Sequence, residues 1–486
     1  MKKGKFILAV LVLSLLNACK LDIQPTEKLT VANLLSLNDG LEVATAGNYA
    51  LLKDVLEFRG DENLNNSYVR HMYQMSEFAA DNVMYTQYSS DPLYLVFTRN
   101  HVAAQDNSSY FWFMAYKLIL GTNLLIENMG EGASPASDQM LGENYFLRAM
   151  AQFDLLKFFA FPYTHGASNL GIILRTGTSE PQSKARATVG ESYDQVVADL
   201  LKAIELMNAP RGVEYASKEA AQALLSRVYL YMEKNQLALD YANDVITSGA
   251  SSLASQADYV NNFANTQNSS ESIFIIKHTP PMDYTGKEGS IGSMYYDDGN
   301  NGGWGEVFVS QTFLDLIQQH PEDVRNDLIQ ITGTKKNGFP VRYILKFTGQ
   351  DGFVNLTSPQ YLRLSEMYLN RAEANAKIGN DQSALDDVNV IRSRAGLSGA
   401  ALYTLGNLGG RSVLDIVLEE RRLELAYEGH RSFDQYRNKR DMDRSYEGIH
   451  LASGETTQII PFDDNRNIFF IPPGELNTNP ECIQNN

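Results

Sequence analysis

Apolar residues recur at helical spacing along much of the chain, most clearly in two stretches, residues 217–249 and 360–397. In the second stretch one helix face carries only apolar or small side chains, those of Tyr361, Leu364, Ser365, Tyr368, Leu369, Ala372 and Ala376. Gly379 then ends this helix, and a second amphipathic helix follows. Both stretches therefore predict pairs of helices whose small alanines allow close contact. Paired helices of about 34 residues are typical of tetratricopeptide-like repeats.

Two further helix starts are indicated by local capping signals. Thr188 and Glu191 have the spacing of a capping box, in which each side chain bonds the backbone N–H of the other residue. Ser412 and Asp415 repeat that spacing ahead of another amphipathic stretch. We therefore expect helices to begin directly after residues 188 and 412.

Long polar segments, rich in glycine and asparagine, separate the predicted helices. The largest are residues 60–110 and 280–308, and a shorter one covers residues 396–411. Loops of this length are usually either functional or disordered. Residues 66–116 contain seven of the 26 tyrosines of the chain, whereas disordered segments are poor in aromatic residues. We therefore expect these loops to carry the function.

The charge balance excludes one class of partner. The chain has 486 residues, 44% of them hydrophobic, which is enough to bury a sizeable core. Its formal net charge is −17. Binding to nucleic acid without regard to sequence needs a basic surface, so we expect no nucleic-acid partner.

The first residues have the parts of an export signal. Lys2, Lys3 and Lys5 precede an apolar run, Phe6 to Leu16, which is too short to span about 30 Å of hydrocarbon. The tetrapeptide LNAC that ends at Cys19 resembles the lipobox of bacterial lipoproteins. That resemblance implies cleavage after residue 18 and a diacylglycerol thioether on Cys19, which would leave the other cysteine without a disulfide partner. The alternative is an ordinary secretory signal followed by a chance cysteine.

Several segments, in their order and spacing, resemble the SusD/RagB-like family of surface lipoproteins from Gram-negative glycan and peptide uptake systems. They are AGNYALL, SEFAADNVMY, NYFLRAMAQFDLLKFFAFPY, YLRLSEMYLNRAEANAKIG, VNVIRSRAGL, IVLEERRLELAYEGHRSFDQYR and IPPGELNTNPECIQN. The resemblance runs nearly end to end, and the fragments together are far more specific than any one of them.

The resemblance implies a mostly α fold. Four tetratricopeptide-like helix pairs would form a scaffold, the SusD-like α/α superhelix, with a loop-rich irregular subdomain packed on it. The chain would divide into a lipoprotein signal peptide at 1–18, a SusD-like N-terminal region at 19–215 and a SusD/RagB C-terminal region at 216–486. The two regions would pack together as one unit.

The resemblance also implies a role at the outer membrane, on the cell surface. The protein would capture an oligosaccharide and deliver it to a partner, a SusC-like TonB-dependent β-barrel transporter. Two alternatives stay open: an oligopeptide-binding protein of the RagB type, and a surface glycoside hydrolase. A pure assembly scaffold is a third interpretation, because helical repeats commonly bind protein partners.

The residues themselves give little support for catalysis. The chain has no G-x-S-x-G, H-E-x-x-H, Walker loop or G-x-G-x-x-G sequence, so we predict neither an enzyme nor a cofactor. The charged stretch 419–431 predicts a helix with ion pairs between its own turns, closed by Gly429. Asp463, Asn465 and Asn467 begin a calcium-loop spacing but lack its glycine and its last glutamate, which favours a turn without metal.

A sugar offers flat patches of C–H groups, which aromatic rings can cover, and hydroxyl groups, which amide and carboxylate side chains can bond. The two long loops supply both kinds of side chain. The ligand-binding candidates are Asp81, Asn82, Tyr85 and Tyr88 in the first loop and Tyr295, Tyr296, Asp298, Asn301 and Trp304 in the second. Trp112 lies instead in an apolar helical stretch and is predicted to belong to the core.

Overall fold

The computed structural model describes residues 33–34, 37, 39–450 and 458–485. The chain separates into two compact units, residues 1–44 and 45–486, and helix α3 (Gly40–Ala50) runs across their boundary. The predicted signal peptide, residues 1–18, and the predicted lipid attachment at Cys19 lie outside the described residues. Of the helices in the described part, none combines the length and the apolar character that a membrane crossing requires.

Fifteen α-helices among the described residues define a mostly α fold, as predicted. After α3 they are α4 (Tyr68–Phe78), α5 (Pro92–Phe97), α6 (Asp106–Asn128), α7 (Pro135–Phe159), α8 (Val189–Leu206), α9 (Lys218–Tyr231), α10 (Asn235–Ser248), α11 (Asn261–Ala264), α12 (Gln311–Ile317), α13 (Leu364–Lys377), α14 (Asp381–Arg394), α15 (Val413–Glu424), α16 (Arg431–Arg437) and α17 (Pro473–Thr478).

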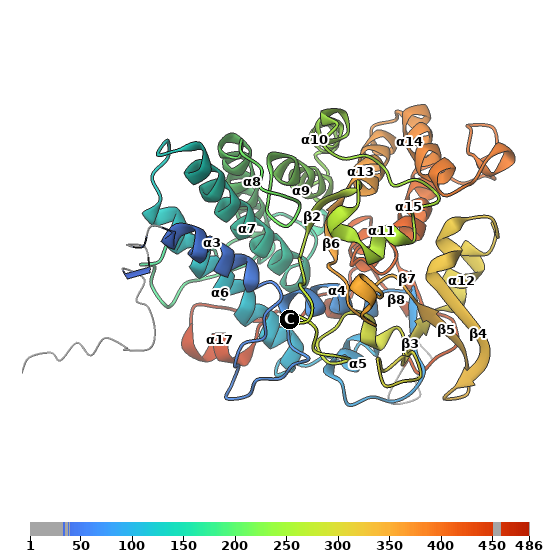
Figure 1. Ribbon diagram of the computed structural model, residues 1–486, viewed down its shortest axis with the longest axis horizontal. Helices are drawn as coiled ribbons and strands as arrows, with labels where there is room; N and C mark the ends of the chain where they lie inside the picture. The colour runs from blue at the N-terminus through green and yellow to red at the C-terminus, as the bar shows by residue number, and fades with distance from the viewer. Residues whose placement is uncertain (1–32, 35–36, 38, 451–457, 486) are drawn as a thin grey trace, which may run out of the picture. The chain divides into compact units, whose positions relative to one another are not determined.

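Neighbouring helices pack in a continuous series, α6–α7–α8–α9–α10–α13–α14, with α15 against α13 and α14 (Figure 1). The two stretches with helical spacing form the pairs α9–α10 and α13–α14, as the sequence predicted. Although α11, α12 and five strands lie between these pairs in sequence, α10 packs directly on α13. The predicted scaffold of stacked helix pairs is therefore confirmed.

Buried small residues allow the paired helices to lie close together. Ala238 and Ala242 of α10 and Ala384 of α14 are fully buried. Across the first pair, the Oγ of Ser226 donates a hydrogen bond to the carbonyl oxygen of Ala238 over 2.8 Å. Larger apolar side chains fill the space around these contacts, and each contributes about 1.5–3 kcal/mol when it is fully buried.

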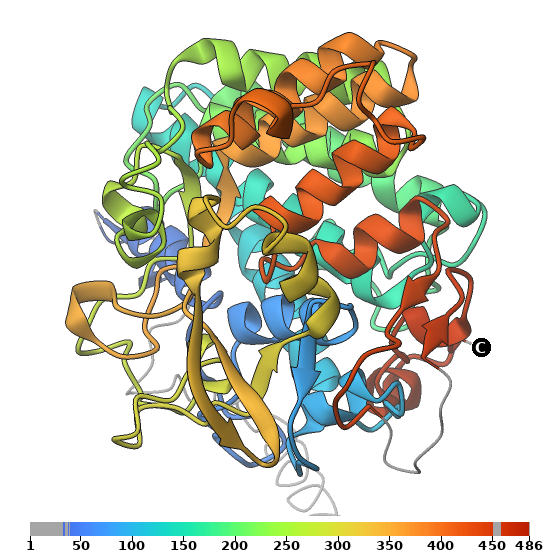
Figure 2. The same cartoon turned by 90° about the vertical axis from the view of Figure 1, so that its right-hand side faces the viewer.

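Eight short strands form four antiparallel pairs in the described part, β1–β3, β2–β6, β4–β5 and β7–β8. Their bounds are β1 (Val83–Tyr85), β2 (Ser272–Ile275), β3 (Val307–Val309), β4 (Ile329–Lys336), β5 (Phe339–Ile344), β6 (Gln360–Arg363), β7 (Met442–Asp443) and β8 (Ile459–Ile460). The hairpin β4–β5 lies beside β1 and β3, with β5 against β3 (Figure 2). These strands and the loops around them form the irregular part that the family resemblance implied.

Both predicted capping boxes are present. The Oγ1 of Thr188 accepts from the backbone N–H of Glu191 over 3.1 Å, and the Glu191 carboxylate accepts from the backbone N–H of Thr188 over 2.9 Å. Ser412 and Asp415 make the same reciprocal bonds at the start of α15. The end of that helix differs from the prediction, because α15 ends at Glu424, well before Gly429.

The prediction that residues 419–431 pair with one another along one helix was wrong. The fully buried Glu424 instead accepts from Arg363 over 2.6 Å and from Arg394 over 2.5 Å, and these arginines belong to β6 and α14. Arg421, also buried, bonds Asp434 of α16 over 3.0 Å. The charges therefore join elements that are distant in sequence, and a charge pattern along one segment carries no information about such partners.

Candidate functional site

The two loops predicted to bind ligand are joined by backbone hydrogen bonds. Strand β1 continues the helix–loop segment that ends at Asn82, and β3 follows the glycine-rich segment around Trp304. The two strands pair antiparallel, and the backbone N–H of Thr86 donates to the carbonyl oxygen of Glu306 over 3.0 Å. The structure thus brings residues 80–91 and 292–306 side by side, although helices α6 to α10 of the helix stack lie between them in sequence.

Asp81 and Asn82 lie beneath the loops and are buried. The Asp81 carboxylate accepts from Arg431 over 2.8 Å, and the Oδ1 of Asn82 accepts from Arg422, also over 2.8 Å. Burial raises the pKa of Asp81, but Arg422 and Arg431 outweigh it and hold the pKa below its usual value. Asp81 is therefore ionised, and both side chains fix the first loop to α15 and α16.

Tyr85 and Tyr295 are also fully buried, and both pack on one ring. The ring of Phe78, at the end of α4, lies 5.5 Å from the Tyr85 ring and 5.9 Å from the Tyr295 ring, in edge-to-face geometry. Burial raises the pKa of both phenols well above the usual value, so both stay protonated. These two tyrosines form the aromatic base on which the two loops rest.

Tyr296, Asp298 and Asn301 build the turn ahead of Trp304. The half-buried Tyr296 ring meets the Tyr343 ring edge-on at 5.5 Å. The Oδ1 of Asp298 accepts from the backbone N–H groups of Asn300 and Gly302, each over 2.9 Å, and these bonds lower its pKa. Asn301 is exposed and has a left-handed backbone (φ 70°), which asparagine tolerates better than most residues.

Tyr88 and Trp304 present aromatic surface outside the core. The side chain of Tyr88 is 65% exposed, and its ring meets the buried Tyr94 ring edge-on at 6.1 Å. Trp304 is half-buried, and the Nζ of Lys287 lies 3.9 Å from its ring centre. Of the aromatic candidates, Tyr88 is exposed, Trp304 and Tyr296 are half-buried, and Tyr85 and Tyr295 are buried.

Trp304 lines a cavity of about 290 Å³, which we call the Trp304 cavity. The first loop contributes Ser89, Ser90 and Asp91 to its wall, and the second contributes Met294, Trp304 and Glu306. The rest of the wall includes residues from the segment that leads into α4, from α4 itself and from the start of α6: Asn63, Asn65, Asn66, Arg70, His71 and Asn107. The predicted loops therefore meet at one polar cavity, together with residues that the sequence reasoning missed.

Three polar atoms of residues that line this cavity are covered by protein and have no hydrogen-bond partner among the described residues. They are the Nε of Arg70, the Nδ1 of His71 and the Nδ2 of Asn107, and each of the three residues is at most 2% exposed. Burial and the charge of Arg70 hold the pKa of His71 well below its usual value, so the ring is neutral. Its Nε2–H donates to the Oδ1 of Asn66 over 2.9 Å, which leaves Nδ1 as an acceptor.

The described residues of the cavity wall include three carboxylates, those of Asp91, Asp106 and Glu306, and Asp106 pairs with Arg59 over 3.3 Å. Asp91 pairs with Arg70 over 3.1 Å and also accepts from the backbone N–H of Leu93, at the start of α5. Glu306 accepts a short hydrogen bond from Gln87, and burial raises its pKa. Over the described residues, no group of three His, Cys, Asp or Glu side chains has the geometry to hold a metal ion.

Part of the cavity wall that the sequence reasoning missed could have been suspected from the sequence. Three asparagines, Asn63, Asn65 and Asn66, stand within four positions of the long first loop, and amides in such loops are candidates for sugar recognition. Arg70 and His71 carried no such signal, because both lie on a helix and resemble ordinary surface residues. Trp112 is buried at 5% exposure against Phe159, as predicted.

Two family models match this chain. Residues 41–230 match the model described as "Starch-binding associating with outer membrane", and residues 326–486 match the model described as "SusD family". Two SusD-like proteins of Formosa agariphila are 23% and 27% identical to this chain, over 91% and 80% of its length and 93% and 82% of theirs.

Solved structures show the same fold. A SusD superfamily protein from Bacteroides thetaiotaomicron VPI-5482 is 29% identical, covers 92% of this chain and 99% of its own, and has a TM-score of 0.81. A second one, from Bacteroides vulgatus ATCC 8482, is 28% identical, with 92% and 98% covered and a TM-score of 0.79. The structure is a stack of helix pairs that carries a polar cavity between two loops, and the matches show that this fold is shared with SusD superfamily proteins. The chain belongs to the SusD/RagB-like family.

Proposed function

We propose that this protein captures an oligosaccharide in the Trp304 cavity and delivers it to a partner, a SusC-like TonB-dependent transporter of the outer membrane. Lipid on Cys19 would anchor the chain to the outer membrane at the cell surface. The family model that matches residues 41–230 supports the proposal, because its description names both starch binding and the outer membrane. Both proposed regions, 19–215 and 216–486, contribute to the cavity wall, so they act as one unit in this proposal.

The observation that carries the proposal is the polar lining of the Trp304 cavity, to which both loops contribute. The side-chain amides of Asn63, Asn65 and Asn66 offer donors and acceptors, and Ser89 and Ser90 offer hydroxyl groups. A hydroxyl group both donates and accepts, so a ligand with many hydroxyl groups suits this mixture.

Two aromatic rings at or beside this wall could stack on the C–H patches of a sugar. Trp304 lies in the wall, and Tyr88 directly precedes Ser89 and Ser90 of the same wall. We assign stacking on the ligand to these two rings, and polar contacts to Asn301, Asp298 and the hydroxyl of Tyr296 on the neighbouring turn. Asp81, Asn82, Tyr85 and Tyr295 position the loops from below, according to their buried contacts.

The pairing of the carboxylates in the cavity wall favours ligand capture over glycoside hydrolysis. A glycoside hydrolase needs two carboxyl groups free to act on the bond, one as acid and one as base or nucleophile. Asp91 is held by Arg70 and by the start of α5, so it is engaged in structure. Asp106, the third carboxylate of the wall, pairs with Arg59 over 3.3 Å. Glu306 has a raised pKa and could serve only as the acid, which leaves no unpaired carboxylate among the described residues of this wall as base or nucleophile. The protein therefore acts, in this proposal, as a binding protein.

Calorimetric titration of the purified protein, without residues 1–18, against a panel of glycans and oligopeptides tests the proposal. Trp304→Ala and Tyr88→Ala are each expected to weaken glycan binding about tenfold or more, since stacked aromatic residues commonly contribute over 1 kcal/mol. Tyr241→Ala, a half-buried tyrosine of α10 stacked on Tyr229, is the matched control and leaves binding unchanged. Co-purification with the barrel tests the partner.

Three results would contradict this function. Peptide binding with no glycan signal would favour the RagB-type alternative. Release of reducing sugar on prolonged incubation with bound glycan would show a hydrolase. Unchanged glycan uptake by cells that carry Trp304→Ala and Tyr88→Ala would favour a pure assembly scaffold.

A further inference from the structure

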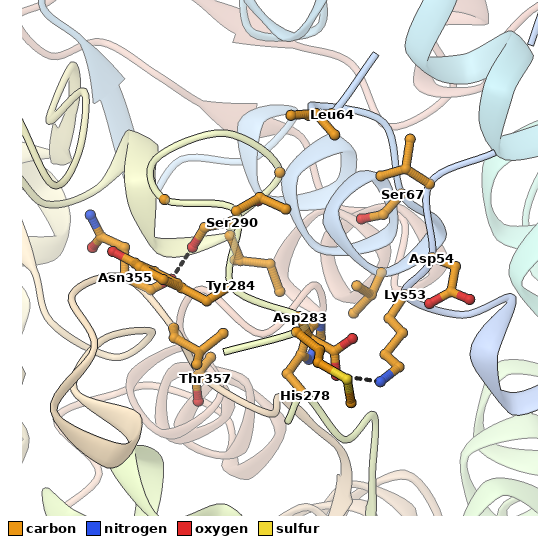
Figure 3. Close-up of a pocket in the computed structure, with 18 residues that line it drawn as sticks. Lys53, Asp54, Leu64, Ser67, His278, Asp283, Tyr284, Ser290, Asn355 and Thr357 are labelled. Carbon is orange, nitrogen blue, oxygen red and sulfur yellow. Dashed lines mark hydrogen bonds and ion pairs between the residues drawn. The ribbon is translucent and has the colours of Figure 1, made fainter. Parts of the chain in front are cut away.

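A second cavity of about 290 Å³ lies next to the Trp304 cavity, and we call it the His278 cavity. Its wall includes Lys53, Asp54, Leu64, His278, Met282 and Tyr284. Figure 3 shows Lys53, Asp283 and His278 gathered at one end and Tyr284, Ser290 and Asn355 at the other. The site described above uses none of these side chains.

The two cavities share a wall. Along the segment that leads into α4, Asn63, Asn65 and Asn66 line the Trp304 cavity, whereas Leu64 and Ser67 line the His278 cavity. The second loop lies against this segment, because the backbone N–H of Gly289 donates to the Oδ1 of Asn65 over 3.3 Å. Gly289 has a left-handed backbone (φ 72°), and a Cβ there would collide with the carbonyl oxygen of Leu64. The backbone of residues 63–67, which we call the Asn63–Ser67 strip, therefore separates the two cavities.

The loop at residues 282–289 has side chains at the His278 cavity and at the Trp304 ring. Met282, Tyr284 and Gly289 line the His278 cavity, whereas Lys287 projects over the ring of Trp304. A ligand that contacts the Trp304 ring thus lies beside the loop that encloses the His278 cavity.

The polar end of the His278 cavity offers acceptors. The Nδ1–H of His278 donates to the carbonyl oxygen of Ile276 over 3.1 Å, which leaves Nε2 as the acceptor of a neutral ring. Burial, followed by the charge of Lys53, lowers the pKa of His278 to about 4, so the ring stays neutral at physiological pH. Lys53 is paired with Asp283, whereas the carboxylate of the exposed Asp54 has no hydrogen-bond or ion-pair partner within the described ranges.

The rim of the His278 cavity is apolar. The side chain of Met282 is 81% exposed and that of Leu64 is 41% exposed, although large apolar side chains usually avoid water. The Tyr284 ring is held 4.9 Å from the Phe353 ring. Acceptors at one end and exposed apolar side chains at the rim together match the hydroxyl groups and the C–H patches of a sugar unit.

We infer that the His278 cavity is a second subsite of the same ligand site, which takes hydroxyl-bearing units of an oligosaccharide whose other end occupies the Trp304 cavity. This inference rests on the proposed function. It adds that the ligand is an oligomer long enough to cross the Asn63–Ser67 strip, and that Asp54 and His278 accept from its hydroxyl groups. A unit bound in one cavity holds the next units close to the other, so affinity rises with chain length until both cavities are filled.

Calorimetry with the series from maltose to maltoheptaose, and with cello- and xylo-oligosaccharides in parallel, tests the inference. The double variant Asp54→Asn, Met282→Ala changes two exposed side chains, so the fold is retained. It is expected to lose about tenfold in affinity for the longest ligands and nothing for the shortest, since tenfold corresponds to about one lost charge-assisted hydrogen bond. Asp240→Asn, Leu405→Ala, a matched pair of exposed residues elsewhere, leaves both affinities unchanged.

The outcomes separate the inference from the proposed function. Glycan binding that is lost with Trp304→Ala but is equally tight, for the longest ligands, in the wild type and the Asp54→Asn, Met282→Ala variant would overturn the second subsite alone. Affinity that does not rise with ligand length in the wild type would also overturn it. Absence of binding to every glycan, or binding of peptides only, would overturn the proposed function and the subsite with it.

Discussion

The Nζ of Lys287 lies 3.9 Å from the ring centre of Trp304 and 2.5 Å from the Oδ1 of Asn301. One face of the indole is therefore covered by a cation, which the neighbouring turn holds in place. A cation over an aromatic ring at an exposed site is worth about 0.5–1 kcal/mol. A sugar that stacks on the covered face must displace Lys287 and lose that energy.

Lys287→Ala is therefore expected to strengthen glycan binding about two- to fivefold, because the indole face is then open. Calorimetric titration with the best glycan of the panel measures the change. Lys234→Ala is the matched control, since the Nζ of Lys234 lies 5.9 Å from the Tyr229 ring in the helix stack. Weaker binding by Lys287→Ala would show that the ammonium group contacts the ligand itself.

The helix pairs were predictable because their signal is local. The spacing of apolar residues in 217–249 and 360–397 already defines which face of each helix is buried, and the structure confirms both pairs. Contacts between the pairs were not predictable. No local pattern shows that α10 packs on α13 or that Glu424 bonds Arg363, because those partners are brought together only by the complete fold.

The site was predictable as a region more than as a set of residues. Both loops border the Trp304 cavity, yet Tyr85 and Tyr295 point to the interior while Tyr88 is exposed. All three are tyrosines in polar stretches of the sequence. Tyr85 and Tyr295 pack on Phe78, at the end of helix α4, which forms within the segment 60–110 that the sequence indicated as a loop. The exposure of a loop aromatic residue thus depends on distant packing that a single sequence does not reveal.

The buried ion pairs of Glu424 are expected to be essential for stability. Glu424→Gln leaves Arg363 and Arg394 short of one buried counter-charge, which costs about 3–5 kcal/mol. Urea unfolding measures the loss. Glu131→Gln is the control, because Glu131 is half exposed and pairs with Lys202 at the surface, where the expected cost is below about 1 kcal/mol. Equal effects of the two variants would contradict the role of the buried cluster.

The same carboxylate makes the protein sensitive to acid. Burial raises the pKa of Glu424, but Arg394, Arg363 and other cations outweigh it and hold the pKa well below 4.5. A carboxyl group whose pKa is lower in the folded state stabilises the protein above its unfolded pKa, and that stability is lost as the pH falls below it. Melting temperatures are therefore expected to fall from about pH 5 to about pH 3, less steeply in Glu424→Gln. A parallel decline in both proteins would contradict this cause.

Lipid attachment at Cys19 predicts how the chain partitions in cells. Labelled palmitate is expected to enter the wild-type protein and to be absent from Cys19→Ala, because the second cysteine, Cys482, is buried. The variant is also expected to leave the membrane fraction, because it lacks the acyl chains that would hold the protein there. Cys482→Ala is the control and retains the label. Unlabelled wild-type protein would favour the ordinary secretory signal.

Glu77 has the opposite pH dependence to Glu424. Its side chain is fully buried, its Oε1 accepts from the backbone N–H of Gly429 over 3.0 Å, and its Oε2 has no partner among the described residues. Burial raises its pKa from 4.5 to about 7, a shift that the bond from Gly429 only partly offsets. The unfolded chain therefore loses this proton at lower pH than the folded chain does.

Stability should consequently fall as the pH rises from 4.5 to about 7, by about 1.4 kcal/mol for each pH unit at most. Glu77→Gln cannot ionise, so its free energy of unfolding, relative to wild type, is expected to increase over this range and to level off above it. Urea unfolding at about pH 5 and about pH 8 measures the difference, with Glu131→Gln as a control that shows no such change. A difference between Glu77→Gln and wild type that is the same at both pH values would show that Glu77 is already ionised at the lower pH.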